Sequence, residues 1–137
     1  MFEVIIKYVP HADIDKRKWD RCIDKAMNGL IYGYSYYLDI RSKNWDALVI
    51  DNYEAVMPLA FNKKVGISYL RQPAFTQQVG IFGSPPFNNN LIQAFIDKAL
   101  EHFPFIEINL NFANHHKNET VKKCNLILPL NKSFIEI

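Results

Sequence analysis

Residues 45–71 read WDALVIDNYEAVMPLAFNKKVGISYLR, and this stretch contains strand-like segments in close succession. The segments, residues 45–51, 54–61 and 66–71, are rich in the β-branched, aliphatic and aromatic residues that are typical of strands. The connections between them are short and carry Asp, Asn or Lys, so we expect antiparallel hairpins. Pro58 would remove a ladder donor from the middle segment, which predicts a bulge or an outward-facing position there.

The sequence before this stretch predicts one strand followed by two helices. Residues 2–9 are rich in Val, Ile and aromatic residues and end at Pro10, which indicates a strand. Asp13 is a candidate N-cap for the first helix, whose apolar residues recur at helical spacing up to Asn28 and Gly29. These apolar residues are Trp19, Cys22, Ile23, Ala26 and Met27. Residues 30–40 predict a second, shorter helix.

The sequence after this stretch predicts a further strand at 76–82 and a helix with a wide apolar face, capped within residues 88–90 and ending near Phe103. A strand at 105–110, a polar loop at 113–123 and a last strand at 125–130 follow. The order β, α, α, β, β, β, β, α, β, loop, β indicates an α+β domain with a mixed, mainly antiparallel sheet flanked by helices. The strand–helix–strand unit around the last helix implies one parallel neighbour pair.

Length and composition indicate a single compact globular domain of 137 residues. The formal net charge is only +2 and the basic pairs are scattered, so we expect no nucleic-acid partner. No apolar run approaches the roughly 18 residues that cross a bilayer, and the N-terminus lacks a leader pattern. We therefore expect no membrane span, a cytoplasmic location and free thiols at Cys22 and Cys124.

Motifs for hydrolytic, nucleotide-binding and zinc chemistry are missing from the sequence. His115 and His116 are adjacent, and neighbouring side chains on a helix or strand do not share a face. We therefore expect a solvated loop there and no metal site. No general base can be named, so the catalytic residues stay unassigned.

Uncharged polar residues gather in the stretch QPAFTQQVGIFG, residues 72–83. Gln72, Gln77 and Gln78, together with Arg71, could hydrogen-bond a peptide or a sugar in a groove where glycine lets a ligand approach the backbone. They could equally cap a strand and satisfy the backbone groups of a loop. Asn109, on the next predicted strand, would face the same region.

Tyrosine side chains are a second group of candidate ligand contacts. Tyr36 and Tyr69 belong to a set that could line a groove, because tyrosine combines an apolar ring with a polar tip. The other members are Tyr32, Tyr34 and Tyr37. Packing at the edge of the core or against a partner explains the same residues, so both interpretations stay open.

The element order resembles the acyl-CoA N-acyltransferase (GNAT) fold. In that family the sheet splays between two strands, and a signature of Gln or Arg, two residues, Gly, one residue, then Gly or Ala binds the acyl-CoA pyrophosphate through backbone N–H groups. Gln77 and Gly80 match its first two positions, whereas Phe82 stands at the third. Because Phe82 is bulky and the prolines at 85 and 86 have no N–H group, the resemblance implies a degenerate cofactor site.

Several segments, among them KWDRCIDKAMNGLIYGYSYYLD, are similar to the first half of uncharacterised bacterial proteins that resemble the Fem-type peptidoglycan aminoacyltransferases. Those proteins carry two GNAT-like halves. The resemblance implies that the chain is the N-terminal half of a longer protein, and that the other half recognises acetyl-CoA or another acyl donor. The expected partner is that C-terminal half, or a second copy of this chain in a homodimer.

These observations predict an acyltransferase-like domain that contributes a substrate groove or a packing surface and has no complete acyl-CoA site. The expected groove residues are Tyr36, Tyr69, Arg71, Gln72, Gln77, Gln78 and Asn109. Two alternatives remain. One is a stand-alone acetyl-CoA-dependent N-acetyltransferase, in which Gln77 and Gly80 would hold the cofactor. The other is a non-enzymatic module that dimerises through an exposed sheet edge.

Overall fold

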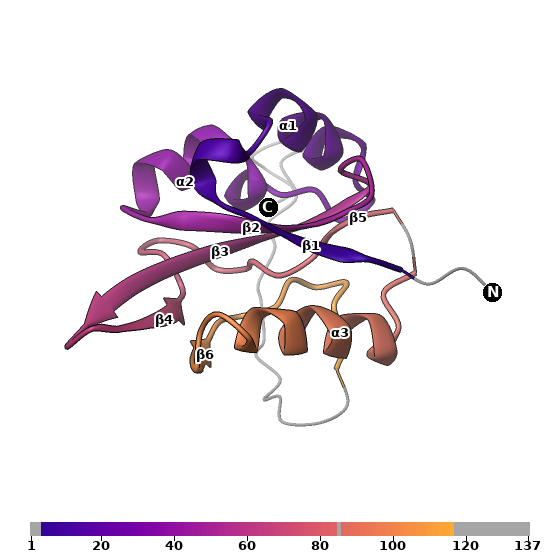
Figure 1. The fold of residues 1–137 in the computed structure, drawn as a ribbon. Coiled ribbons are helices and arrows are strands. Elements are labelled where there is room, and N and C mark those ends of the chain that lie inside the picture. Colours follow the sequence, from indigo (N-terminus) through magenta and orange to yellow (C-terminus); the bar gives the residue numbers. More distant parts are fainter. Residues whose placement is uncertain (1–3, 85, 117–137) are drawn as a thin grey trace, which may run out of the picture.

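The computed structural model describes residues 4–84 and 86–116 of the chain, and in this range it is an α+β fold (Figure 1). The strands are β1 (Ile6–Val9), β2 (Trp45–Ile50), β3 (Ala55–Lys64), β4 (Ile67–Arg71), β5 (Phe82–Gly83) and β6 (Phe105–Glu107). The α-helices are α1 (Lys16–Lys25), α2 (Ser35–Arg41) and α3 (Asn89–Leu100), and two short 3₁₀ helices are η1 (His11–Asp13) and η2 (Ile31–Gly33).

The strands form one mixed sheet in the order β1-β2-β3-β4-β6, with β5 paired to β3 outside this path. All neighbours are antiparallel except β4 and β6, which run parallel. This confirms the predicted α+β class and the mainly antiparallel sheet. The parallel pair differs from the prediction, because β6 lies beside β4 and not beside the strand directly before α3, and only the bridge between Val79 and Leu110 joins the two segments that were expected to pair. The predicted strand at 125–130 lies outside the described residues, as does most of the predicted loop at 113–123.

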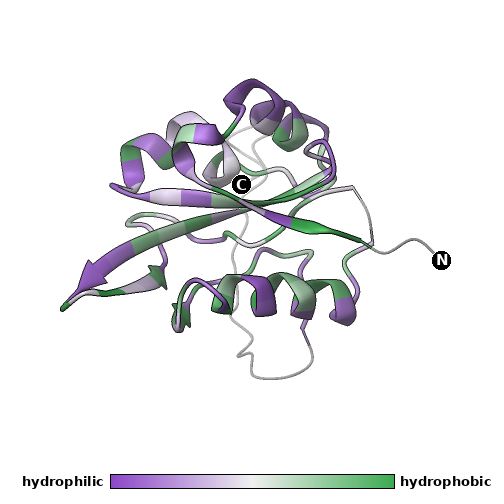
Figure 2. Cartoon of the chain, viewed as in Figure 1, coloured by the Kyte–Doolittle hydropathy of each residue, from purple (hydrophilic) through white to green (hydrophobic). Residues whose placement is uncertain are grey.

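An apolar core lies on each face of the sheet. Trp45, Ala47 and Val49 of β2 belong to the core beneath α1 and α2, whereas Leu48 and Ile50 belong to the core against α3. Figure 1 shows α1 and α2 above the sheet and α3 below it. A strand covered on both faces needs apolar residues at nearly every position, and β2 meets this requirement. Figure 2 shows hydrophobic and hydrophilic residues side by side on α3, as expected for a helix with one buried face.

Pro58 lies in the middle of β3, where the expected bulge or outward-facing position is wrong. β2 and β3 pair residue by residue from Trp45 opposite Ala60 to Ile50 opposite Ala55, without an extra residue, and Pro58 is buried opposite Ala47. On its other edge β3 changes partner, because β5 pairs with residues 55–56 and β4 with residues 61–64. Pro58 lies between these two pairings, where a missing N–H group interrupts neither of them.

The first helix starts later and ends earlier than predicted. Its N-cap is Asp15, whose side chain accepts a hydrogen bond of 3.1 Å from the backbone N of Lys18, and Asp13 lies in η1 instead. The helix ends at Lys25, and the side chain of Met27 is 68% exposed, so Met27 does not continue the apolar face. The chain turns early because the Asn28 side chain is fully buried in contacts with other segments.

The predicted helix at 30–40 is divided into η2 and α2. Gly33 lies at the end of η2, and a Cβ atom there would be 3.0 Å from Cδ1 of Ile23 and 3.1 Å from the ring of Phe82. The close approach of these core side chains to the backbone therefore favours glycine at this position. In the β3–β4 hairpin, β3 extends to Lys64, so the connection is Val65 and Gly66 and not the predicted 62–65.

The largest departure from the sequence prediction is the segment 76–82. Only Phe82 and Gly83 form a strand, and Val79 makes a single parallel bridge to Leu110. Phe75 and Gly80 have positive φ angles of 61° and 96°, which no regular strand accommodates. After α3 in the sequence, the predicted strand at 105–110 is also shorter than expected. It consists of β6 and the single bridge from Leu110 to Val79. The predicted cap of α3 is confirmed, because the Asn88 side chain accepts a hydrogen bond of 2.8 Å from the N of Leu91.

Candidate functional site

A groove with a volume of about 620 Å³ lies along β4 and β6. It is lined by Tyr69, Leu70, Arg71, Gln72, Phe105, Ile106, Glu107, Ile108 and Asn109. Four of the predicted site residues, Tyr69, Arg71, Gln72 and Asn109, therefore line one cavity although they come from segments far apart in the sequence. We call this cavity the β4–β6 groove.

In the described part of the chain, the core that includes α3 packs against one face of β4 and β6, and the exposed side chains of the β4–β6 groove lie on the other face. Leu70 and Ile106 point to the first of these faces and join the core around α3. Their neighbours alternate to the other face, where Tyr69 pairs in register with Phe105 and Arg71 with Glu107. Phe105 is 64% exposed, and Arg71 and Glu107 are exposed as well.

Phe105 and Glu107 were not among the residues predicted from the sequence. The alternation of residues 105–110 places Phe105, Glu107 and Asn109 on one face, but the sequence does not show which strand lies beside them. The parallel register with β4 brings them next to Tyr69 and Arg71. Only the pairing of the strands therefore identifies them as groove residues.

The Gln72 side chain fills the gap where β4 and the segment after β6 stop pairing. Its Oε1 accepts a hydrogen bond of 3.0 Å from the N of Asn109, and its Nε2 donates one of 3.1 Å to the carbonyl of Thr76. Beyond this point the backbone pairing resumes between Val79 and Leu110. Gln72 therefore satisfies backbone groups of the loop, as one of the two interpretations of the sequence expected. It also lines the groove.

The remaining predicted site residues do not line the β4–β6 groove. Gln78 accepts a hydrogen bond of 2.8 Å from the N of Phe112, and Gln77 is exposed on the same loop. Tyr36 lies on α2, half exposed, with its ring stacked on Tyr34 at 5.4 Å. The fold therefore brings four of the seven predicted residues together in one groove and places the other three elsewhere.

Three N–H groups of the stretch around Gly80 are bonded within the protein. The N of Val79 donates to the carbonyl of Asn109 at 2.8 Å, the N of Ile81 to Oδ1 of Asn114 at 2.7 Å, and the N of Gly83 to Oδ1 of Asn28 at 3.1 Å. A phosphate group would have to break these bonds to use the same donors. As the chain is folded, these three donors are therefore occupied and not available to the pyrophosphate of an acyl-CoA.

Three buried asparagines explain why this stretch is irregular. The side chains of Asn28, Asn111 and Asn114 all donate to the carbonyl of Ile81, at 2.8, 2.9 and 3.2 Å. A Cβ atom on Gly80 would collide with Oδ1 of Asn114. Glycine at 80 thus allows Asn114 to approach the backbone, a role unrelated to a ligand. The sequence offered no signal for this cluster, because its members are up to 86 residues apart.

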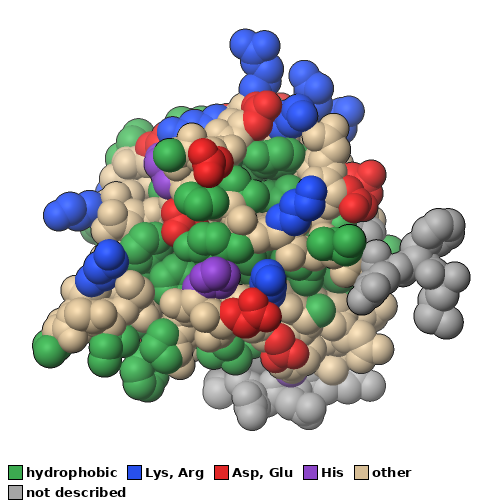
Figure 3. All heavy atoms as spheres, in the orientation of Figure 1, with side chains coloured by type: hydrophobic (Ala, Val, Ile, Leu, Met, Phe, Trp, Pro, Cys, Tyr) green, Lys and Arg blue, Asp and Glu red, His purple; other side chains and the backbone are tan. Residues whose placement is uncertain are grey.

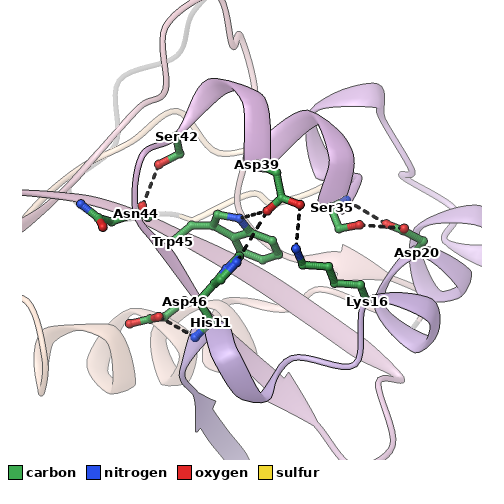
Figure 4. A network of polar contacts seen from close by, with 9 residues as sticks. All are labelled: His11, Lys16, Asp20, Ser35, Asp39, Ser42, Asn44, Trp45 and Asp46. Carbon is green, nitrogen blue, oxygen red and sulfur yellow. Dashed lines mark hydrogen bonds and ion pairs between the residues drawn. The ribbon is translucent and has the colours of Figure 1, made fainter.

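A second, smaller cavity of about 210 Å³ lies at the end of α2 and is lined in part by His11, Asp39 and Asp46 (Figure 4). Asp39 accepts hydrogen bonds from Nζ of Lys16 at 2.7 Å and Nε1 of Trp45 at 2.9 Å. Burial acts to raise the pKa of Asp39, but these hydrogen bonds and the charge of Lys16 outweigh it and lower that pKa below its ordinary value. Asp39 is therefore a carboxylate at neutral pH.

Asp46, on the opposite wall of this cavity, holds the chain entering η1. It accepts a hydrogen bond of 2.8 Å from the N of His11 and another from the hydroxyl of Tyr8. Burial, together with the hydrogen bond and the charge of Asp46, raises the pKa of Tyr8, so this hydroxyl stays protonated. Asp39 thus connects α2 to α1 and β2, and Asp46 connects β2 to β1 and η1. These contacts account for the positions of both carboxylates without a ligand.

The outer surface of α1 is basic. Arg17, Lys18, Arg21 and Lys25 are exposed there, and Figure 3 shows Lys and Arg side chains gathered at the top of the view, over this helix. Lys18 donates to the Asn52 side chain at 2.9 Å. The opposite face of α1 carries the buried Trp19 and Ile23, so the basic side chains form the solvated face of an amphipathic helix.

Within residues 4–84 and 86–116, no group of three or more His, Cys, Asp or Glu side chains is arranged to hold a metal ion. Over the same range, none of the helices has the length and the apolar character needed to cross a membrane. His116, part of the predicted solvated loop, contacts the Gln93 side chain at 2.8 Å through Nε2.

Comparison with protein-family models, curated proteins and solved structures found no match to this chain.

Proposed function

We propose that this chain is an acyltransferase-like domain that binds the acceptor of the reaction in the β4–β6 groove and depends on another domain for the acyl donor. The β4–β6 groove carries this proposal, because it gathers polar and aromatic side chains from two strands on an open face of the sheet. The order of helices and strands, with one parallel pair in an antiparallel sheet, supports it as well.

The contribution of such a domain would be to hold and orient the acceptor. In acyl transfer an amine attacks an activated carbonyl, and a large part of the rate can come from keeping the two reactants in position. Tyr69 and Phe105 offer apolar area, and Arg71, Glu107 and Asn109 offer polar contacts. We assign no general base.

The dependence on another domain follows from the stretch around Gly80. The N–H groups of Val79, Ile81 and Gly83 are held at 2.7–3.1 Å by acceptors within the protein. Breaking a buried hydrogen bond of this kind costs about 1–3 kcal/mol. Three such bonds would have to be exchanged for contacts with a phosphate, which disfavours acyl-CoA binding by this chain alone.

Calorimetry and NMR test both halves of this proposal. Acetyl-CoA titrated into the protein should give no saturable heat at micromolar concentration. A short peptide with a free amino group should shift the backbone amide signals of residues 69–72 and 105–109. Micromolar binding of acetyl-CoA would favour a stand-alone acetyltransferase, and peptide-induced shifts confined to other residues would overturn the assignment of the groove.

A further inference from the structure

We infer that the β4–β6 groove recognises a zwitterionic ligand, a short peptide whose free carboxylate is bound by Arg71 and whose free ammonium group is bound by Glu107. This inference rests on the proposed function, since it names the ligand class of the same groove. It assigns a role to Glu107 that the sequence did not indicate.

The two charges are placed side by side by the sheet. Arg71 and Glu107 are register partners on neighbouring parallel strands, so their side chains leave the same face from backbones about 4.8 Å apart. Both are exposed and both line the groove. Among the residues that the structure describes, neither forms an ion pair within 4.0 Å, including with each other. Each charge therefore lines the groove without an ion-pair partner within 4.0 Å in the described part of the chain.

A ligand that carries both charges has an energetic advantage at such a site. An exposed Arg–Glu pair is worth only about 0–1 kcal/mol, so the two side chains lose little by turning away from each other to a ligand. A carboxylate can accept two parallel hydrogen bonds from the arginine guanidinium, a geometry that an amide or an ester cannot match. A ligand with a single charge would leave the other side chain without a partner.

The rest of the groove suits a peptide of two or three residues. Its volume of about 620 Å³ is roughly 20 times the ~30 Å³ that one water occupies in the liquid. An extended dipeptide spans about 7 Å, longer than the spacing of two strands, so its ends can reach both side chains. The rings of Tyr69 and Phe105, two residues back along each strand on the same face, provide apolar area for small side chains.

NMR titrations with three related dipeptides test the inference. The probes are alanyl-alanine, its N-acetylated form and its C-terminal amide, which remove one charge at a time. Alanyl-alanine should shift the amide signals of residues 69–72 and 105–109 saturably, and each capped form should bind about tenfold more weakly. Binding of the free dipeptide should also weaken as salt is added.

Two variants assign each charge to its residue. In Arg71→Gln the free dipeptide and its C-terminal amide should bind equally, while the N-acetylated form still binds more weakly. In Glu107→Gln the free dipeptide and its N-acetylated form should bind equally, while the C-terminal amide still binds more weakly. Arg21→Gln and Glu54→Gln, at exposed positions away from the groove, are matched controls that should bind as the wild type does.

The outcomes separate this inference from the function on which it rests. Equal affinity of all three dipeptides at the groove would overturn the zwitterion inference and leave the acceptor groove in place. No shift at residues 69–72 or 105–109 with any of the three would contradict the groove itself. If both variants still preferred the free dipeptide over both capped forms, residues other than Arg71 and Glu107 would bind the two charges, and the inference would be wrong.

Discussion

Val65 lies at the tip of the β3–β4 hairpin with a positive φ of 52° and is 92% exposed. Gly66 beside it has a φ of 76°. A two-residue hairpin in which both residues have positive φ favours Asn followed by Gly, whereas a β-branched residue is strained there. Val65 buries too little of its side chain to offset that strain.

Replacing Val65 by Asn should therefore stabilise the protein. We expect a gain of about 1 kcal/mol in the free energy of unfolding, which corresponds to about 3–5 °C in melting temperature. Urea unfolding followed by circular dichroism measures it. Val65→Thr keeps the β-branch and should show no gain, and a stability of Val65→Asn at or below that of the wild type would contradict the strain.

Gln72 both hydrogen-bonds the backbone of its loop and lines the candidate groove. Gln72→Leu keeps a similar size but removes the partners of the Asn109 N–H group and the Thr76 carbonyl. Because the bonded groups are partly buried, we expect a loss of about 1–3 kcal/mol in the free energy of unfolding.

Gln77→Leu is the matched control, since Gln77 is exposed on the same loop. It should change the free energy of unfolding by no more than about 0.5 kcal/mol. Equal effects of the two substitutions would mean that the Gln72 hydrogen bonds do not stabilise the loop. The two variants also separate a structural role from ligand binding, because stability is measured without any ligand.

At the scale of the elements, the three asparagines Asn28, Asn111 and Asn114 hold β5 and the residues before it against the turn after α1. Asn28 is fully buried, donates to the Ile81 carbonyl and accepts from the N of Gly83. It also donates to Oδ1 of Asn111 at 3.0 Å. This network replaces the regular ladder that a strand at 76–82 would have formed.

Asn28→Ala should destabilise the protein by about 2–4 kcal/mol, because it leaves the Gly83 N–H group buried without its partner and opens a polar cavity. Hydrogen exchange should locate the effect, with faster exchange of the Gly83 amide. Asn52→Ala, at an exposed position, should cost less than about 0.5 kcal/mol. A loss below 1 kcal/mol in Asn28→Ala would indicate that the network is dispensable.

Among the elements, those defined by local signals were predicted best. β2, β3 and α3 have the expected position and type because strand composition, helical spacing and the Asn88 cap act within a few residues. The segment 76–82 was predicted as a strand from its composition, but its hydrogen bonds with Asn111 and Asn114, about 30 residues away, determine its shape. Local propensity cannot report such distant partners.

At the scale of the whole molecule, the free energy of unfolding should depend on pH in the alkaline range, because some groups have a higher pKa in the folded state than in the unfolded state. A hydrogen bond to Asp24, together with burial and the charge of Asp24, raises the pKa of Tyr34 from 10.0 to about 12. Burial raises the pKa of the Cys22 thiol from 9.0 to about 11. Since the folded pKa values are the higher ones, the folded state holds these protons more tightly than the unfolded state does.

The stability contributed by these groups is therefore complete below about pH 9 and is lost as the pH rises through about 11 to 12. Urea midpoints between pH 8 and pH 11 should fall with rising pH. Tyr34→Phe should make this fall less steep, because it removes one of the ionising groups. A pH-independent midpoint in the wild type would contradict the linkage.

The arrangement of layers explains which part of the candidate site was visible in the sequence. Tyr69, Arg71, Gln72 and Asn109 were selected as polar or amphipathic residues on or next to predicted strands, and the fold places them in one groove. Tyr36 was grouped with them by residue type, but it lies on α2 and does not line the groove. Residue type alone identified candidates, and the fold decided which of them meet.

The sequence by itself determined the α+β class, the antiparallel hairpins and the order of helices and strands, because alternation, helical spacing, caps and turn residues act over short distances. Only the tertiary structure decided that Arg71 lies beside Glu107, that three asparagines converge on Ile81, and that β4 and β6 together line a groove. The reason is register. A shift of one residue in the β4–β6 pairing would turn every side chain of one strand to the opposite face, and nothing within a single strand sets that alignment.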